Sequence, residues 1–557
     1  MKLTKIMAAA AVALFAFAAA SAADGKTTIF LVGDSTCATK SLDKQNPERG
    51  WGHMFQPFFD SSIVVENHAV NGRSTKSFRD EGRWDKVLET MKSDDYVFIE
   101  FGHNDQKEKD PKRFSTPEQY AENLRAFIFE VRGNGGTPVL LTPIVRRHWD
   151  NGRLLDTHGE YVKQVKRIAE EEEVIMFDME ADTRRWVTSL GDEASRDYFM
   201  WVAPGTCPLY PDGRQDDTHL NVKGARIVAG MVADHIAEAI PELAEHLVRY
   251  DFVVAKDGSG DFFTVGEMID AVPNFAQNEI NVLIRNGVYK EKNSISSTKR
   301  HLHLTGESVE GTVITYDDFA SRKGPVGNLG TSGSSSLYIC CDDFTAENIT
   351  FENSAGSVGQ AVAVQCIGDR MVFRNCRFLG NQDTLYLHGY GNREGKEYVP
   401  NSRIYFVDCY VEGTTDFIFG SATALFENCR IHSKSNSMVT AASTCKGQPY
   451  GFVFRNCDFT ANDGVDKVRL GRPWRDYAQT VLIDCRLGGH IMPEGWHNWN
   501  RPEAEKTVLY GEYGSTGEGA NAKSRVAWSK KLDAATVKTK YTKEAILGGT
   551  DGWNPEK

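Results

Sequence analysis

The chain has 557 residues, of which 41% are hydrophobic, 11% aromatic and 25% charged. A chain this rich in aromatic residues buries enough apolar surface to offset its conformational entropy, which excludes disordered, collagenous and low-complexity proteins. The 64 Lys and Arg residues against 76 Asp and Glu residues give a net charge of −12 without a basic half, which argues against a nucleic-acid partner. The length predicts two or more domains.

The first 22 residues have the composition of a secretory signal peptide. Lys2 and Lys5 give a positive start, residues 6–20 are small or apolar, and residues 20–22 supply a small-residue cleavage site. A membrane anchor is the alternative, but a spanning helix needs roughly 20 apolar residues, and no later segment is long enough either. We therefore expect a protein exported to the periplasm or outside the cell, without a membrane span.

Residues 23–248 alternate short apolar segments with segments of helical period, and we expect them to form the first domain. The apolar segments are short enough to be buried strands, so the alternation predicts a doubly wound, parallel α/β sheet. Thr116 is placed to cap a helix that starts at Pro117. Active sites in such sheets lie beyond the carboxyl ends of the strands. The predicted strands are residues 28–32, 63–70, 96–101, 138–144 and 174–179.

A candidate nucleophile and its base lie near opposite ends of this first domain. Ser35 follows the first predicted strand, where this fold exposes a nucleophile. His219 precedes the last long helix and has Asp216 three residues before it, so that the carboxylate can hold one imidazole nitrogen while the other faces a hydroxyl. Each motif alone is more often an ordinary turn or helix cap.

Two further loops offer donors for the oxyanion that forms during acyl transfer. Gly72 follows the second predicted strand and Asn104 follows the third, so each sits where a donor can reach the same carbonyl oxygen. Either loop alone would be an ordinary Gly-rich loop. The combination with Ser35 and His219, in this order along the chain, predicts an esterase site.

These motifs resemble the SGNH hydrolase superfamily, and specifically the rhamnogalacturonan acetylesterase family, over nearly all of residues 27–247. The resemblance implies Ser35 as nucleophile, His219 as base and Asp216 as its orienting acid. It also implies an oxyanion hole made by the amides of Ser35 and Gly72 and the side chain of Asn104. The matching motifs are Gly33-Asp34-Ser35-Thr36, Gly50-Trp51-Gly52, Gly72-Arg73-Ser74 with Ser77-Phe78, Gly102-His103-Asn104-Asp105 and Asp216-Asp217-Thr218-His219.

Residues 249–557, the expected second domain, contain an internal repeat with a period of roughly 20 to 30 residues. Short β-rich units of this spacing predict a right-handed parallel β-helix. The Cys residues at the fourth position of most motifs are expected to stack inside the helix. This interpretation is favoured over a disulfide framework. The motifs are Phe351-Glu352-Asn353-Ser354, Phe373-Arg374-Asn375-Cys376, Phe406-Val407-Asp408-Cys409, Phe426-Glu427-Asn428-Cys429, Phe454-Arg455-Asn456-Cys457 and Leu482-Ile483-Asp484-Cys485.

The repeat brings four polar residues into phase. Gln360 and Gln382 each follow the fourth position of their motif by six residues, and Asp383 and Asp416 follow theirs by seven. Equal phase in stacked coils predicts a Gln over a Gln and an Asp beside an Asp, about 4.8 Å apart. Two carboxylates this close have split pKa values, which suits one as acid and the other as nucleophile. Because Gln382 and Asp383 are adjacent, a bend must bring both to one site.

Two residues of a later motif are candidates for substrate binding. Arg472 can keep one Asp charged and grip a substrate carboxylate, and Trp474 can stack on a sugar ring, although a surface Arg is usually solvated and a Trp is usually core. The long unit between the two Asp motifs is expected to loop out at residues 389–401.

Five motifs of this half resemble the pectin methylesterase family over about residues 251–557. The resemblance implies that Asp416 attacks a methyl ester while Gln360 and Gln382 stabilise the oxyanion. Asp383 then protonates methanol and activates water. No cofactor or metal is implied, and the sequence has no metal-ligand cluster. The motifs are Gly287-Val288-Tyr289-Lys290-Glu291, Gln360-Ala361-Val362, Gln382-Asp383-Thr384, Asp416-Phe417-Ile418-Phe419-Gly420 and Leu470-Gly471-Arg472-Pro473-Trp474.

Together the two resemblances predict a two-domain enzyme that removes acetyl and methyl esters from pectic polysaccharide. A polysaccharide lyase or glycosidase is an alternative for the β-helix, but a glycosidase needs carboxylates at wider separations and no stacked Gln pair. The first domain has two alternatives, an esterase for another substrate or a carbohydrate-binding module with an inactive site. The sequence determines neither the acetylated sugar nor the oligomeric state.

Overall fold

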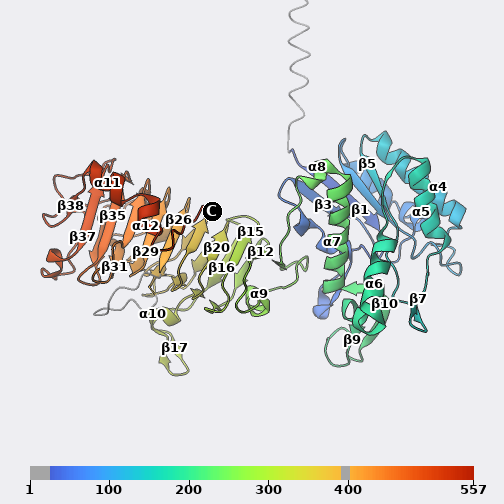
Figure 1. The fold of residues 1–557 in the computed structure, drawn as a ribbon, viewed down its shortest axis with the longest axis horizontal. Coiled ribbons are helices and arrows are strands. Elements are labelled where there is room, and N and C mark those ends of the chain that lie inside the picture. The colour runs from blue at the N-terminus through green and yellow to red at the C-terminus, as the bar shows by residue number, and fades with distance from the viewer. Residues whose placement is uncertain (1–24, 390–401, 557) are drawn as a thin grey trace, which may run out of the picture. The chain divides into compact units, whose positions relative to one another are not determined.

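The computed structural model describes residues 25–389 and 402–556, which form two compact units (Figure 1). The first contains the described residues up to Arg249 together with Asp257–Asp261, and the second contains Tyr250–Lys256 and the residues from Phe262 onward. The predicted signal peptide and the predicted loop beyond Gly389 lie outside the described residues. Within the two described ranges, no helix has both the length and the apolar character that a membrane crossing requires.

A parallel sheet of order β3-β1-β4-β5-β8 forms the centre of the first unit. All five predicted strands are present, but β3, β5 and β8 are shorter than predicted. The strand β3 ends at Asn67, whose side-chain oxygen accepts a hydrogen bond from the amide of Ala69 and so starts a turn. The strands are β1 (Thr27–Gly33), β3 (Ile63–Asn67), β4 (Tyr96–Glu100), β5 (Thr137–Leu141) and β8 (Ile175–Phe177).

Helices cover both faces of this sheet, as the sequence predicts. Ile29 and Leu31 of β1 pack into one core with α6 and α7, whereas Phe30 and Val32 pack into a second core with α3, α4 and α5. This alternation along one strand is the signature of a doubly wound sheet. The helices are α2 (Thr75–Asp80), α3 (Arg83–Thr90), α4 (Pro117–Gly133), α5 (Glu160–Glu171), α6 (Met179–Ser195), α7 (Val222–Ala239) and α8 (Pro241–Ala244).

A small antiparallel sheet positions the predicted acid and base of the first unit. Asp216 and His219 both lie in β10 (Arg214–Asn221), between β2 (Glu48–Arg49) and β9 (Phe199–Val202). The register of β10 with β9 shifts between Asp216 and Leu220. Such an irregularity redirects side chains locally, and here it falls at the residues that face Ser35.

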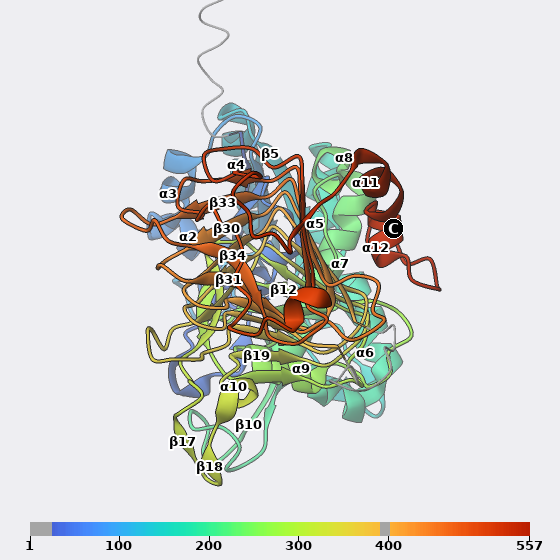
Figure 2. The same ribbon diagram turned by 90° about the vertical axis from the view of Figure 1, so that its left-hand side faces the viewer.

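The second unit is a parallel β-helix built from three parallel sheets. Its strands run side by side along the unit in Figure 1, and Figure 2 looks down the stack of coils. The helix α9 (Val265–Ala271) packs its apolar side chains into the first coils of the interior.

Each sheet takes one strand from successive coils. The first contains β11 (Phe252–Val254), β12 (Ile280–Ile284), β15 (Leu302–Gly306), β20 (Phe344–Glu347), β23 (Met371–Arg374), β26 (Arg403–Val407), β29 (Thr423–Glu427), β32 (Phe452–Arg455), β35 (Gln479–Ile483), β37 (Leu509–Tyr513) and β38 (Lys530–Lys531). The second contains β13 (Gly287–Lys290), β16 (Thr312–Tyr316), β21 (Thr350–Asn353), β24 (Arg377–Leu379), β27 (Tyr410–Gly413), β30 (Arg430–Ser433), β33 (Asp458–Ala461) and β36 (Arg486–Leu487). The third contains β14 (Asn293–Ile295), β19 (Leu337–Ile339), β22 (Val364–Cys366), β25 (Leu385–Leu387), β28 (Ile418–Gly420), β31 (Met438–Ala442) and β34 (Arg469–Pro473).

Aromatic rings and thiols stack in the interior of the β-helix. The ring of Phe406 lies between those of Phe373 and Phe426, with centroid distances of 5.0 and 4.4 Å. All eleven Cys are free thiols, and the predicted interior ladder is present. Its members, all buried, are Cys376, Cys409, Cys429, Cys457 and Cys485.

The first motif of the predicted repeat is misaligned. The strand neighbour of Phe373 is Ala346 of β20, whereas Phe351 lies in β21 of another sheet, opposite Phe378. Phe351 also faces the interior, where its ring stacks on Phe378 at 5.5 Å. Inward positions of both sheets thus accept Phe, which is why the four-residue pattern alone selected the wrong strand.

Replacing the stacked ring of Phe406 by a small side chain should destabilise the second unit strongly. Because Phe406 is fully buried between two rings, Phe406→Ala should cost about 3–5 kcal/mol and lower the unfolding temperature of that unit. Thermal unfolding measures the effect, with the exposed Val288→Ala as the matched control. An unfolding temperature equal to that of the control would contradict the stacked interior.

Candidate active sites

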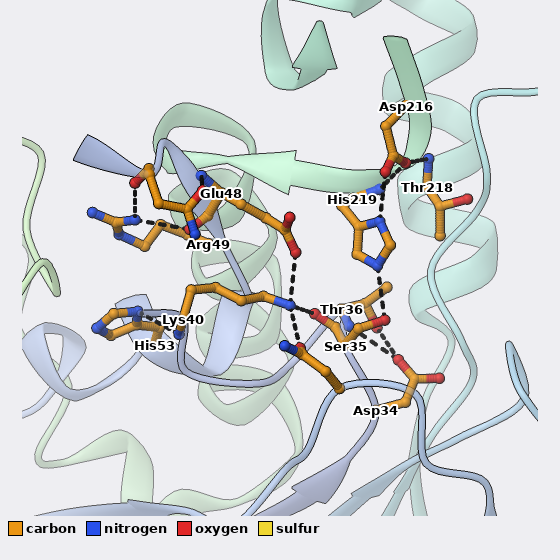
Figure 3. A network of polar contacts seen from close by, with 12 residues as sticks. Asp34, Ser35, Thr36, Lys40, Glu48, Arg49, His53, Asp216, Thr218 and His219 are labelled. Atoms are coloured by element: carbon orange, nitrogen blue, oxygen red, sulfur yellow. Dashed lines mark hydrogen bonds and ion pairs between the residues drawn. The ribbon is translucent and has the colours of Figure 1, made fainter. Parts of the chain in front are cut away.

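Ser35, His219 and Asp216 form one hydrogen-bonded row in the first unit (Figure 3). His219 Nε2 lies 2.9 Å from Ser35 Oγ, and Nδ1 lies 2.8 Å from Asp216 Oδ2. The second carboxylate oxygen accepts hydrogen bonds from the backbone amides of Thr218 and His219. The structure thus brings Ser35 to a His-Asp pair whose imidazole lies 184 residues away in the sequence.

Asp216 is held in its ionised form. Burial by itself would raise its pKa, but hydrogen bonds from His219 and Arg214 and the positive charges they bring hold that pKa well below its usual range. An ionised Asp216 accepts a proton-bearing Nδ1 and leaves Nε2 free to take the proton of Ser35. The row can therefore activate a serine hydroxyl for attack on an ester.

Lys40 joins the nucleophile loop to the neighbouring loop (Figure 3). Its ammonium donates to the carbonyl oxygen of Ser35 and to Oδ1 of Asn71, both at 2.6 Å, and pairs with Glu48 Oε1 at 2.9 Å. The Lys40 side chain is only 2% exposed, and Glu48 also contacts Arg214. No sequence motif marks Lys40, because its importance comes from three partners that the fold brings together.

The predicted oxyanion donors lie around the nucleophile loop. Gly72 has a φ of +76°, which glycine adopts readily, and among the described residues neither its amide nor that of Ser35 donates a hydrogen bond. Asn104 Nδ2 donates to the carbonyl of Arg73 at 3.0 Å and has a weak 3.4 Å contact with Asp34 Oδ2. Both N–H groups of the Asn104 side chain therefore have acceptors here, and the weak contact with Asp34 is the one that an oxyanion would replace.

Asp383 and Asp416 are neighbours across two coils of the second unit. The pairing of Leu385 in β25 with Ile418 in β28 sets the register, which puts the two aspartates opposite each other. Both have left-handed backbones, with φ of 69° and 50°. This bend is the one the sequence required, since it lets Asp383 and the adjacent Gln382 line the same cavity.

Gln360 and Gln382 also lie side by side, as a parallel bridge pair. The prediction is correct, although the alignment behind it was not. The strand partner of Thr350 is Arg377, so Gln360 follows its strand by five residues more than Gln382 does. The predicted repeat aligned Phe351 with Phe373, whereas the true neighbour of Phe373 is Ala346, five residues earlier. The two five-residue differences cancel, so Gln360 still lies beside Gln382.

The two aspartates have unequal surroundings. Burial raises the pKa of Asp383 to about 8, and the charge of Asp416 adds to this while Arg472 opposes it. Burial also raises the pKa of Asp416, but Arg472 opposes it directly through Nε–Oδ1 and Nη2–Oδ2 contacts of 2.9 and 2.6 Å. Asp416 is therefore the carboxyl that ionises first, and Asp383 keeps its proton near neutral pH.

A cavity of about 700 Å³ opens above these carboxyl groups. It is lined by all six predicted residues of the second unit, Gln360, Gln382, Asp383, Asp416, Arg472 and Trp474. Sequence reasoning missed Tyr386, Phe419 and Trp499, which add an aromatic wall. Tyr386 and Phe419 pair in register like the two aspartates, so the same phase rule could have found them, whereas Trp499 follows the last repeat and carries no such signal.

Trp499 holds the cation of the second site in place. The guanidinium of Arg472 lies 3.7 Å from the centroid of the Trp499 ring, while its donors reach Asp416. A stacked guanidinium with two hydrogen bonds to one carboxylate has little freedom to turn. The hydrogen-bond donors of Arg472 that reach Asp416 are thus occupied, which limits its predicted second role of binding a substrate carboxylate.

An α/β unit with a Ser-His-Asp row and a parallel β-helix with a paired-Asp cavity define this chain as a carboxylic ester hydrolase. Residues 251–550 match the Pectinesterase family model, and residues 31–227 match the GDSL-like Lipase/Acylhydrolase family model. The chain belongs to the pectinesterase family, as its sequence motifs predict.

Individual relatives match the second half of the chain. Pectinesterase 31 of Arabidopsis thaliana is 41% identical over 287 residues, which covers 50% of this chain and 86% of the relative. Pectinesterase QRT1 of Arabidopsis thaliana is 39% identical and covers 55% of this chain and 79% of the relative. A solved structure, "Pectin methylesterase from Carrot", is 32% identical with a TM-score of 0.50, covering 54% of this chain and 94% of that one. The predicted right-handed parallel β-helix agrees with this likeness.

Neutralising Lys40 should disable the first site. Lys40→Met removes two hydrogen bonds and an ion pair and leaves Glu48 buried with one cation fewer, so we expect a loss of about 3–5 kcal/mol of stability and a fall in kcat of at least tenfold. Hydrolysis of 4-nitrophenyl acetate and thermal unfolding measure the two effects. The matched control is Lys163→Met, which breaks an exposed pair with Glu160. Activity and stability equal to those of the control would show that Lys40 does not position the loop that carries Ser35.

Proposed function

We propose that the chain is a bifunctional pectin de-esterifying enzyme. Residues 249–557 hydrolyse galacturonate methyl esters to methanol and acid, and residues 23–248 hydrolyse acetyl esters of pectin or rhamnogalacturonan. The observation that carries the proposal is the Asp383–Asp416 pair, in which one member alone has a bound Arg. Membership of the pectinesterase family names the substrate that such a pair would act on.

The first half of the methylesterase reaction uses both aspartates. A carboxylate oxygen of Asp416 attacks the ester carbonyl carbon, and the resulting oxyanion is stabilised by the side-chain amides of Gln360 and Gln382. When the bond to the methoxy oxygen breaks, Asp383 gives that oxygen its proton, and methanol leaves. The products are a mixed anhydride on Asp416 and an ionised Asp383.

The second half reverses the role of Asp383. Its carboxylate takes a proton from a water molecule, whose oxygen attacks the acyl carbon of the anhydride. The bond to Asp416 breaks, Asp416 returns as a carboxylate beside Arg472, and the galacturonate acid departs. The rings of Tyr386, Phe419 and Trp474, which line the same cavity, are suited to packing against sugar rings.

The first unit would remove acetyl groups by serine chemistry. Ser35 Oγ attacks the acetyl carbonyl while His219 takes its proton and then passes it to the departing sugar hydroxyl. Water activated by His219 then releases acetate from acetyl-Ser35. The row of Ser35, His219 and Asp216 and the match to an acylhydrolase family support an esterase, and the pectinesterase unit on the same chain supports a pectic substrate.

The setting of the enzyme follows from its substrate. Pectic polysaccharide lies outside cells, so the proposed activities agree with export, and we infer that residues 1–22 serve as the signal for it. The plant pectinesterases to which this chain is similar act on the same class of polymer by name.

The pH dependence of methanol release should be bell-shaped. Activity rises with pH as Asp416 loses its proton and falls above about pH 8 as Asp383 loses the proton it must donate. Arg472→Met removes the group that favours the ionised Asp416, so the acid limb should move to higher pH and kcat/KM at neutral pH should fall about 100-fold. The exposed Arg486→Met is the control. If the acid limb of Arg472→Met lies at the same pH as that of the wild type, Arg472 does not control the ionisation of Asp416.

Two substitutions test the assignment of each unit. Acetylated, methylated pectin is incubated with the wild type, Ser35→Ala and Asp416→Ala, and acetate and methanol are measured. Ser35→Ala should abolish acetate release and leave methanol release intact, and Asp416→Ala should abolish methanol release, because each removes the atom that attacks. Unchanged amounts of both products from either variant would refute the role of that unit, and unsaturated or shortened oligosaccharides would identify a lyase or glycosidase.

A further inference from the structure

Two cations lie next to His103 and Asn104, where Asn104 is the predicted side-chain donor to the oxyanion at the Ser35 site. Lys107 Nζ donates to Oδ1 of Asn104 at 2.6 Å, and a guanidinium nitrogen of Arg146 donates to the carbonyl oxygen of His103 at 3.1 Å. Both contacts are to neutral oxygens. Throughout residues 25–389 and 402–556, neither cation makes an ion pair with a carboxylate.

A third cation increases the positive charge at this place. A β-carbon at position 72 would lie 3.4 Å from Nη1 of Arg113, so this guanidinium borders the predicted oxyanion glycine. Arg113 is paired with Asp110 at 3.1 Å and therefore contributes only partly. Partial burial, together with the charges of Arg113 and Arg146, lowers the pKa of Lys107, against the charges of Asp34 and Asp110. Burial lowers the pKa of Arg146, against the charge of Asp34.

Cations that lack a direct ion pair beside a nucleophile point to an anionic ligand. Lys107 is exposed as a whole residue, whereas Arg146 is partly buried with no carboxylate at ion-pair distance among the described residues. A bound anion would lower the cost of burying Arg146, and the planar Arg fork matches a carboxylate. The chain as a whole has a net charge of −12, so this group of cations is a local exception to its surface charge. In a pectic polymer the anion is the uronate carboxylate, and a methyl ester removes its charge.

We propose that the Ser35 site binds the free carboxylate of a uronate through Lys107 and Arg146, so that demethylation must precede removal of the acetyl group. The β-helix unit would then produce the form of the polymer that the α/β unit accepts: methanol leaves, and the carboxylate that remains becomes the ligand of the two cations. This inference rests on the proposed function and adds an order to its two reactions.

The test compares two forms of one substrate. Acetylated galacturonan oligomers are prepared fully methylated and fully demethylated, and acetate release is measured with Asp416→Ala, so that methyl esters survive the assay. We expect kcat/KM to be at least about tenfold higher for the demethylated form, the size of one charge-assisted hydrogen bond. With the wild type and the methylated form, acetate release should lag behind methanol release, and Asp416→Ala should turn that lag into a lasting deficit.

A second variant locates the preference. Arg146→Met, made in the Asp416→Ala chain, should reduce the preference for the demethylated form about tenfold, and Arg146→Lys should restore part of it. Lys163→Met in the same chain is the control and should leave the preference unchanged. Because the preference is a ratio measured on one preparation, a loss of folded protein does not alter it.

The outcomes separate this inference from the proposed function. Equal kcat/KM for the two forms, or an Arg146→Met variant that slows both forms alike, would overturn the carboxylate site while leaving the acetylesterase in place. No acetate from either form, with hydrolysis of 4-nitrophenyl acetate retained, would overturn the acetylesterase assignment and the carboxylate site together.

Discussion

The parallel register of the β-helix is the constraint on which the second site depends. Equivalent residues of neighbouring coils lie about 4.8 Å apart, so the ladder forces Asp383 and Asp416 together. Burial raises the pKa of both carboxyl groups, and the direct contact of Arg472 with Asp416 makes them different. A regular fold thus provides two equal groups, and one cation two coils further along the same sheet makes them unequal.

The first unit uses a fixed cation for a different purpose. Arg214 and His219 hold the pKa of Asp216 low, so that this carboxylate orients an imidazole and never has to donate a proton. Glu48 and Lys40 continue the alternation of charges to the carbonyl of Ser35. In the proposed reactions, the same type of side chain therefore serves as a permanent anion in one site and as a proton donor in the other, according to its burial and its counter-charge.

The predicted pairing of the candidate site residues in the β-helix is correct, although one repeat motif was aligned with the wrong strand. The Asp pair was placed by correctly aligned motifs, whereas the Gln pair was placed correctly because a five-residue misalignment and a five-residue loop cancelled. Phe351 caused the error, since an inward Phe fits either of two sheets. Lys40 and Trp499 could not be predicted, because neither lies in a motif or a repeat and each acts through contacts that form only in the folded chain.

The sequence by itself determined both fold classes, the Ser, His and Asp residues of the first site and the phase of the paired Asp and Gln residues in the second. Strand period, repeat spacing and motif order are local properties, and local patterns are readable along a chain. Only the tertiary structure decided which aspartate has the cation and where unpaired cations such as Arg146 gather. Burial and charge pairing depend on residues distant in sequence, so they exist only after the chain has folded.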